Sequence, residues 1–239
     1  MADASGTQIN DSIYESVMGL CRGRGAFLHD WFFGAESRAV PQSLAMIFFG
    51  LGSYGLCMGL GHSWEMAAYV AIKLPFIIFL TLGLNGLING IFASLSGSGI
   101  DFRQSFRFLL SGFGLMGVIL GSLAPIAFFN ALSAPGPDEA AYRDWHQGLL
   151  LGHVTVIALA GILAHWRLLS FLKAHAANPS AALRVFSAWL VGNLIAGSQV
   201  GWIMRPVFGS PGLDAALLRD DPLDGSFFEA VFNALTSLI

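Results

Sequence analysis

The sequence has very few charged residues for its length. Its 239 residues include 12 Lys and Arg and 15 Asp and Glu, whereas a soluble domain of this size would carry about 60 such residues. The mean hydropathy is +0.66, and 55% of the residues are hydrophobic. Such a composition provides too little polar surface for a soluble globular protein, and it predicts a membrane protein.

Charge is also unevenly distributed along the chain. Five stretches contain no charged residue, and each is at least 20 residues long. An α-helix needs about 20 apolar residues to cross a hydrocarbon core of about 30 Å. We therefore predict an all-α membrane protein, a bundle of five transmembrane helices with amphipathic N- and C-terminal segments. The predicted spans are 40–61, 66–92, 108–132, 147–166 and 185–205.

Features that would indicate soluble partners or chemistry are scarce. The two cysteines, Cys21 and Cys57, fall in the N-terminal segment and the first span, so we predict neither a disulfide nor a metal site. The net charge of −3 leaves no basic surface for nucleic acid. His-Glu-x-x-His, Gly-x-Ser-x-Gly and Walker motifs are absent from the sequence, so it predicts no catalytic residue and no cofactor. Residues 1–38 also lack the pattern of a cleaved signal peptide.

The positively charged residues of the short loops indicate the orientation. With the N-terminus in the cytoplasm, eight Lys and Arg lie inside and three lie outside. We therefore predict a cytoplasmic segment 1–39, a membrane domain 40–206 and an external segment 207–239. The Ala- and Gly-rich composition with short loops favours a bacterial inner membrane.

Both ends of the chain show helical patterns outside the spans. Asp11 is a suitable cap for a short amphipathic helix, and aromatic residues dominate 27–33. We interpret this segment as an interfacial anchor, with a docking surface for a cytoplasmic partner as the alternative. Ser226 and Glu229 fit a capping box that opens an amphipathic helix. That helix is too short to cross the bilayer, so we expect it in the outer interface or packed over the bundle.

Polar residues inside spans are candidates for function, because lipid offers them no hydrogen bonds. Lys73 is the only charged residue within a predicted span. It either snorkels towards the outer interface or pairs with Glu65, or it lies buried in a cavity. Asn85 and Asn89 are one helical turn apart in the second span. They favour hydrogen bonding between packed helices, and a polar pore lining is the alternative.

The fifth span has the most unusual pattern. Its small and polar residues share an arc of about 140° at 100° per residue. These residues are Asn193, Gly197, Ser198, Gly201 and Arg205. We predict that this face lies against protein or along an aqueous path, with the side of Leu190 and Leu194 towards lipid. Arg205 precedes Pro206, so a role as an interfacial anchor is also expected.

Two histidines lie seven residues apart in the fourth span. His146 and His153 share a helix face, but the separation of about 10 Å is too large for one metal ion. We expect His146 near an interface and His153 as a core residue with a hydrogen-bond partner.

The layout of 30–206 resembles the Yip family of membrane-trafficking proteins and its prokaryotic relatives. The resemblance lies in the number of spans, their orientation, and the sequence Lys73-Leu-Pro75 at the start of the second span. It implies a non-enzymatic scaffold and identifies no site.

Three functions therefore remain in view. The first is a membrane scaffold or a subunit of a membrane complex, oligomeric and non-catalytic, with the bilayer and membrane proteins as its partners. The second is an oligomeric channel lined by Asn193, Ser198 and Arg205, with Lys73 as a further candidate. The third is an intramembrane enzyme.

Overall fold

The computed structural model describes residues 13–95, 99–135, 141–176, 178–207 and 214–229. Within these ranges the secondary structure is helical. The helices, in chain order, are α1 (Ile13–Arg22), α2 (Gly25–Phe33), α3 (Ala39–Met46), the π-helix η1 (Ile47–Leu51), α4 (Gly52–Gly59), α5 (Trp64–Leu95), α6 (Phe102–Leu132), α7 (Ala141–His175) and α8 (Pro179–Ile203).

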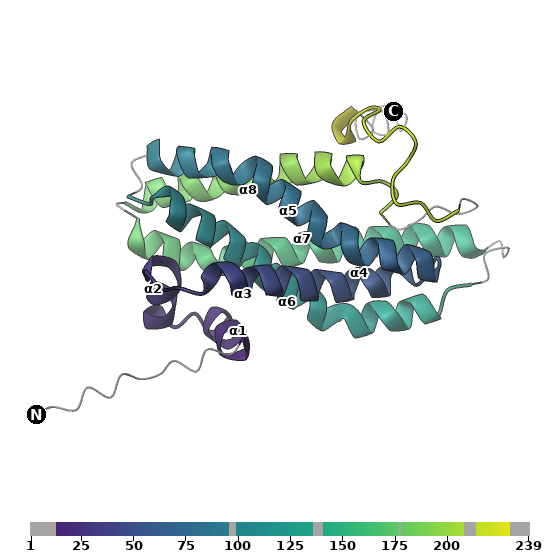
Figure 1. Cartoon of the computed structure of the whole chain (residues 1–239), viewed down its shortest axis with the longest axis horizontal. Helices are drawn as coiled ribbons and strands as arrows, with labels where there is room; N and C mark the ends of the chain where they lie inside the picture. The colour runs from purple at the N-terminus through teal and green to yellow at the C-terminus, as the bar shows by residue number, and fades with distance from the viewer. Residues whose placement is uncertain (1–12, 96–98, 136–140, 177, 208–213, 230–239) are drawn as a thin grey trace, which may run out of the picture.

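Five helical segments are long and apolar enough to cross a membrane, which confirms the predicted fold class. The first of them runs from α3 through η1 into α4, and the others lie within α5, α6, α7 and α8. Figure 1 shows these helices side by side along the long axis of the molecule. Both α1 and α2 lie at one end of this bundle, which we call the α1–α2 end. The opposite end carries the turn that joins α4 to α5.

Several helices are longer than the charge-free stretches that predicted them. The helix α6 begins at Phe102 instead of 108, because Asp101 and Gln104 form a capping box there. The Asp101 side chain accepts a hydrogen bond from the Gln104 amide at 2.7 Å, and the Gln104 side chain accepts one from the Asp101 amide at 3.0 Å. Similarly, α7 runs over Ala141–His175, whereas the predicted span was 147–166. The absence of charged residues indicates only the part of a helix that lies in hydrocarbon. The helix itself extends beyond that part at one or both ends.

Close backbone packing joins the first span to α6. A Cβ atom on Gly50 would lie 2.1 Å from the carbonyl oxygen of Gly117, and one on Gly117 would lie 2.6 Å from the carbonyl oxygen of Met46. Only glycine permits this approach, which places η1 directly against the α6 backbone. The π-helical turn at Ile47–Leu51 is located at this contact.

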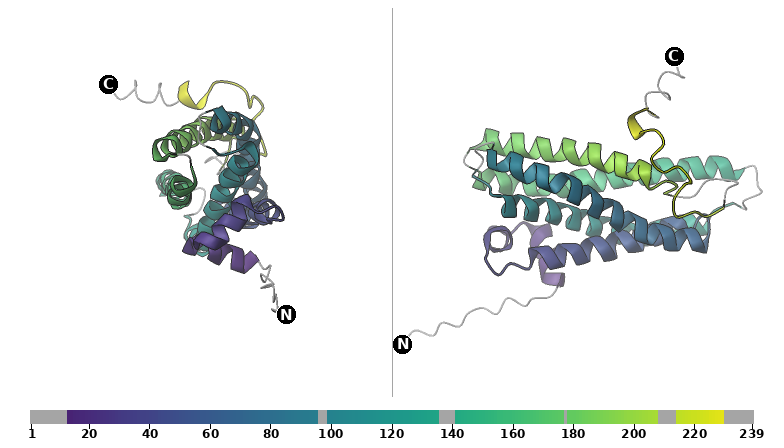
Figure 2. Two further views of the ribbon diagram at one scale, coloured as in Figure 1. Left: turned by 90° about the vertical axis from the view of Figure 1, so that its left-hand side faces the viewer. Right: turned by 45° about the horizontal axis from the view of Figure 1, so that its top comes forward.

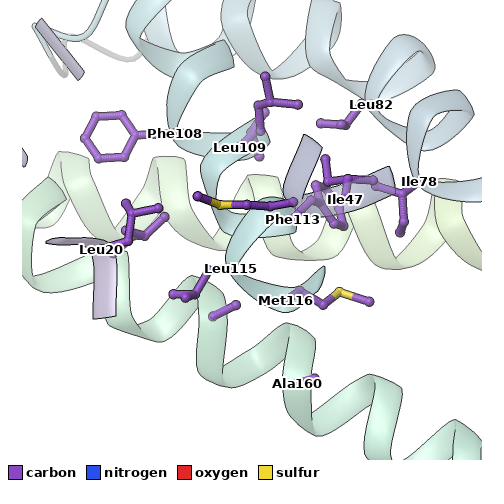
Figure 3. Close-up of a cluster of buried hydrophobic side chains, with 14 of the residues drawn as sticks. Leu20, Ile47, Ile78, Leu82, Phe108, Leu109, Phe113, Leu115, Met116 and Ala160 are labelled. Atoms are coloured by element: carbon purple, nitrogen blue, oxygen red, sulfur yellow. The ribbon is translucent and has the colours of Figure 1, made fainter. Parts of the chain in front are cut away.

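The helix α6 lies at the centre of the core. It packs against α3, η1, α4, α5 and α7, and every residue from 107 to 117 is buried. Figure 3 shows part of the apolar cluster around it, with side chains from the N-terminal helices, the first span, α5, α6 and α7. The labelled members are Leu20, Ile47, Ile78, Leu82, Phe108, Leu109, Phe113, Leu115, Met116 and Ala160.

The two N-terminal helices contribute to this core. Leu20 of α1 and Trp31 and Phe32 of α2 are buried in the same cluster, and Figure 2 shows both helices against the bundle. The Trp31 indole donates a hydrogen bond to Ser111 Oγ at 2.8 Å. The Phe and Trp side chains of 27–33 therefore face protein, since the half-buried Phe27 and Phe33 also pack against this cluster. The predicted cap Asp11 lies outside the described residues.

Candidate functional site

The most unusual polar residue of the bundle is Lys73 on α5. Its side chain is 0% exposed. Nζ donates hydrogen bonds to the carbonyl oxygens of Pro206 at 2.5 Å and Ala216 at 3.1 Å. Snorkelling to water is therefore the wrong interpretation, and the partners are backbone carbonyls instead of Glu65. The physical reason is that residues following α8 return over this part of α5 and enclose the ammonium group.

Three residues near the end of α8 hold the same C-terminal segment. The guanidinium Cζ of Arg205 lies 3.2 Å from the centroid of the Trp202 ring. Both side chains donate to the carbonyl oxygen of Asp224, the Trp202 indole at 3.1 Å and Arg205 Nη2 at 3.2 Å. Gln199 Oε1 accepts a hydrogen bond from the amide of Phe227 at 3.3 Å. We call Lys73, Gln199, Trp202 and Arg205 the C-terminal clasp.

The electrostatics of the clasp are dominated by cations. Burial lowers the pKa of Arg205, the neighbouring Arg219 lowers it further, and Asp224 acts in the opposite direction. Two Arg205 nitrogens, Nε and Nη1, are buried without a hydrogen-bond partner among the described residues. The segment is therefore held mainly by cations that donate to backbone oxygen, a stronger bond than one between neutral groups.

Half of the predicted capping box at the C-terminal helix is present. The amide of Glu229 donates to Ser226 Oγ at 3.1 Å. The rest of that predicted helix lies outside the described residues.

The predicted polar faces of the second and fifth spans meet each other. Asn85 Nδ2 of α5 donates to Asn193 Oδ1 of α8 at 2.9 Å. A Cβ atom on Gly192 would lie 2.7 Å from Asn85 Nδ2, so the neighbouring glycine provides the room for this amide. A Cβ atom on Gly197 would lie 3.6 Å from Thr81 Oγ1. The structure thus brings Asn85, Asn193 and Gly197 into one contact between α5 and α8.

The other predicted residues take different positions. Asn89 is buried with 2% exposure, and its Nδ2 has no partner among the described residues. Ser198 is half-buried. A Cβ atom on Gly201 would meet no atom within 4 Å, so among the described residues Gly201 is not at a tight helix contact. Leu194, on the side predicted to face lipid, is 68% exposed.

Two histidines, the buried His153 and the half-buried His62, contact tyrosines that are distant in the sequence. His153 is 6% exposed, and its Nδ1 lies 2.7 Å from the hydroxyl of Tyr54 on α4. His62 Nδ1 lies 3.3 Å from the Tyr142 hydroxyl at the start of α7. Burial raises the pKa of Tyr142. Neither tyrosine partner could be predicted from the sequence, because no local pattern relates residues that lie 80 or more positions apart.

Within the described part of the chain, no group of three or more His, Cys, Asp or Glu residues is placed to hold a metal ion. The cavity lined by His165 and Trp189 has a volume of only about 10 Å³, enough for one water molecule at most. The fold and these contacts define a multi-pass helical membrane protein with a clasped C-terminal segment. No protein-family model, curated protein or solved structure matches the chain.

Proposed function

We propose that this chain is an integral membrane scaffold or a subunit of a membrane complex, oligomeric and non-catalytic. We place it in a bacterial inner membrane, with the α1–α2 end in the cytoplasm, as the loop charges predict. The observation that carries the proposal is the C-terminal clasp. Its two cations bind backbone oxygens of the same chain, and so they support a fixed surface at the end of the bundle.

The α1–α2 end supports the same proposal. Three arginines from the bundle donate to backbone oxygens at or just after the ends of α1 and α2. Arg167 binds the carbonyl of Cys21 at 2.7 Å, and Arg103 binds that of Ala35 at 3.1 Å. Arg107 Nη1 binds the carbonyls of Phe32 at 2.9 Å and Gly34 at 2.8 Å. Cations at helix C-termini are favourable because they complement the helix dipole.

Each docked segment also exposes apolar side chains. Tyr14 of α1 is 64% exposed and Ile13 is 45% exposed, although the opposite side of α1 is buried. In the C-terminal segment Leu223 is 78% exposed. Apolar residues on segments that are themselves held in place are suited to binding partner proteins.

Site-specific photo-crosslinking in the native membrane tests this proposal. A benzoylphenylalanine introduced at Tyr14 or at Leu223 should give discrete protein adducts. The matched control is the same residue at Leu194, which is 68% exposed on the lipid-facing side and should give lipid adducts only. Equal lipid-only labelling at all three positions would contradict a scaffold.

The channel alternative is tested separately by reconstitution. Purified protein in liposomes should give no more ion flux than empty liposomes. Ion flux through the wild-type protein, with an ion selectivity that changes in the Arg205→Gln variant, would establish the channel instead. The reason is that a charged residue in a pore sets the ion selectivity.

A further inference from the structure

An open groove of about 520 Å³ lies between α5 and α8 near the α1–α2 end. It is lined by Phe92 of α5 and by Ser180, Leu183, Arg184 and Ser187 of α8. The α8 residues follow the spacing i, i+3, i+4 and i+7, so they share one face of the helix. Figure 1 shows the end of α5 and the beginning of α8 at this same end of the bundle. The groove combines one cation and two hydroxyl groups with two apolar side chains.

Arg184 gives the groove its charge. No acidic side chain lines the groove, and no described carboxylate forms a salt bridge with Arg184. Its one hydrogen bond within the described residues runs from Nη1 to Ser180 Oγ at 3.5 Å. A guanidinium has five N–H donors, so most of them are available to a ligand. The chemistry of the groove therefore selects an anion with several acceptor oxygens.

The position of Arg184 along α8 corresponds to the edge of the hydrocarbon core. Trp202 lies 18 residues further along the chain, which is about 27 Å of helix at 1.5 Å per residue. This is close to the hydrocarbon thickness of about 30 Å. Because tryptophan favours the membrane interface, Trp202 marks one interface and Arg184 lies at the other. Phosphate groups of the lipids in one leaflet lie at this depth.

The apolar part of the groove is formed by one side chain from each helix. Leu183 is 48% exposed and Phe92 is 41% exposed. Both are large enough to contact an acyl chain. The groove volume is within the range of about 300–1,000 Å³ that is usual for small-ligand sites.

We propose that this groove binds one anionic glycerophospholipid from the leaflet at the α1–α2 end. The lipid phosphate accepts hydrogen bonds from the Arg184 guanidinium and from the hydroxyl of Ser180, which lies beside it. Ser187, about 10 Å from Ser180 along α8, lies against the ester and acyl part of the same lipid. Its acyl chains pack on Phe92 and Leu183. An anionic headgroup is favoured over a zwitterionic one because Arg184 is an unbalanced positive charge, as in other basic pockets between transmembrane helices.

Native mass spectrometry of the full chain in detergent tests the proposal. The protein is incubated with equal concentrations of phosphatidylglycerol and phosphatidylcholine, and the lipid-bound fraction is measured. Wild type should retain phosphatidylglycerol preferentially. Arg184→Gln should reduce its apparent affinity about tenfold, through loss of the charge-assisted bonds. Arg24→Gln is the matched control, since Arg24 is exposed at the same end and lies outside the groove. It should change the affinity less than about twofold.

Two further measurements test whether the binding site is this groove and whether the ligand is a lipid. Ser187→Trp fills the groove without altering its charge and should reduce phosphatidylglycerol binding as strongly as Arg184→Gln. Ser187 is exposed, so the melting temperature should not change. An excess of inorganic phosphate should leave most of the lipid bound, because phosphate lacks the acyl contacts. Equal binding by Arg184→Gln and Arg24→Gln, unchanged binding by Ser187→Trp, or complete displacement by inorganic phosphate would each overturn the proposal.

Discussion

The helices α1 and α2 and the C-terminal segment 214–229 are attached to the bundle by the same kind of hydrogen bond but by very different apolar packing. At the α1–α2 end, Arg107 donates to two carbonyl oxygens, and Phe32 stacks on Phe108 with ring centroids 3.9 Å apart. At the other end, Lys73 also donates to two carbonyl oxygens. The segment it holds exposes its large apolar residues, such as Leu223 and Phe228.

This difference has an energetic consequence. Burial of an aromatic side chain contributes roughly 1.5–3 kcal/mol, in addition to the hydrogen bonds around it. The N-terminal helices are therefore part of the core, and their release exposes apolar surface. The C-terminal segment is attached mainly by hydrogen bonds, and among its described residues the half-buried Ala215 is the one packed against the core. Its release therefore exposes much less apolar surface. The two attachments should respond differently to loss of their cation.

Arg107→Ala should have the largest effect. The change removes two charge-assisted hydrogen bonds and leaves the Phe32 and Gly34 carbonyls without their donor, so the free energy of unfolding should fall by about 3 kcal/mol or more. Thermal unfolding in mild detergent measures the loss. Arg103→Ala is the control, because the exposed Arg103 donates a single bond and should cost less than about 1 kcal/mol. Equal destabilisation by the two variants would mean that α1 and α2 are not coupled to the core through Arg107.

Lys73→Met should release the C-terminal segment while leaving the bundle folded. Replacing a buried charge by an apolar side chain of similar length is often neutral for global stability. Loss of two charge-assisted bonds should nevertheless raise the open fraction of the segment at least tenfold. Trypsin cleavage after Arg219, which removes 20 residues, reports that fraction.

The matched control is Lys173→Met, which removes the same charge from an exposed position at the end of α7. It should leave the cleavage rate unchanged. If Lys73→Met lowered the melting temperature as much as Arg107→Ala, the contrast between the two ends would be wrong.

Trp202→Phe should have a smaller effect on the same segment. The variant keeps an aromatic ring beneath Arg205 but loses the indole donor to the Asp224 carbonyl. One neutral hydrogen bond contributes about 1 kcal/mol, which corresponds to roughly fivefold faster cleavage after Arg219. A cleavage rate equal to that of Lys73→Met would show that the indole hydrogen bond holds the segment as strongly as the two lysine hydrogen bonds do.

The sequence predicted the five helices but not these attachments, for a definite physical reason. Transmembrane helices depend on local composition. The absence of charged residues from a stretch such as 108–132 directly indicates that it lies in hydrocarbon. The Lys73 contact depends on where a segment more than 130 residues away comes to lie, and no local pattern records that. The polar contact between Asn85 and Asn193 was partly accessible, because both amides would be costly in lipid. Glycines were less informative, since Gly50 lies at a tight contact whereas Gly201 does not.

The smallest effect is expected between the two ends, at the hydrogen bond that joins Asn85 to Asn193. Interhelical polar contacts in membranes contribute about 0.6 kcal/mol on average. Asn85→Leu or Asn193→Leu alone leaves one amide without its partner, so each single variant should lower the melting temperature. The double variant removes both amides, and it should lose less stability than the two single losses added together. A double-mutant cycle in detergent measures this coupling. Strictly additive losses would show that the two amides act independently. Intact coupling together with unchanged liposome flux would identify the contact as helix packing and not as a pore lining.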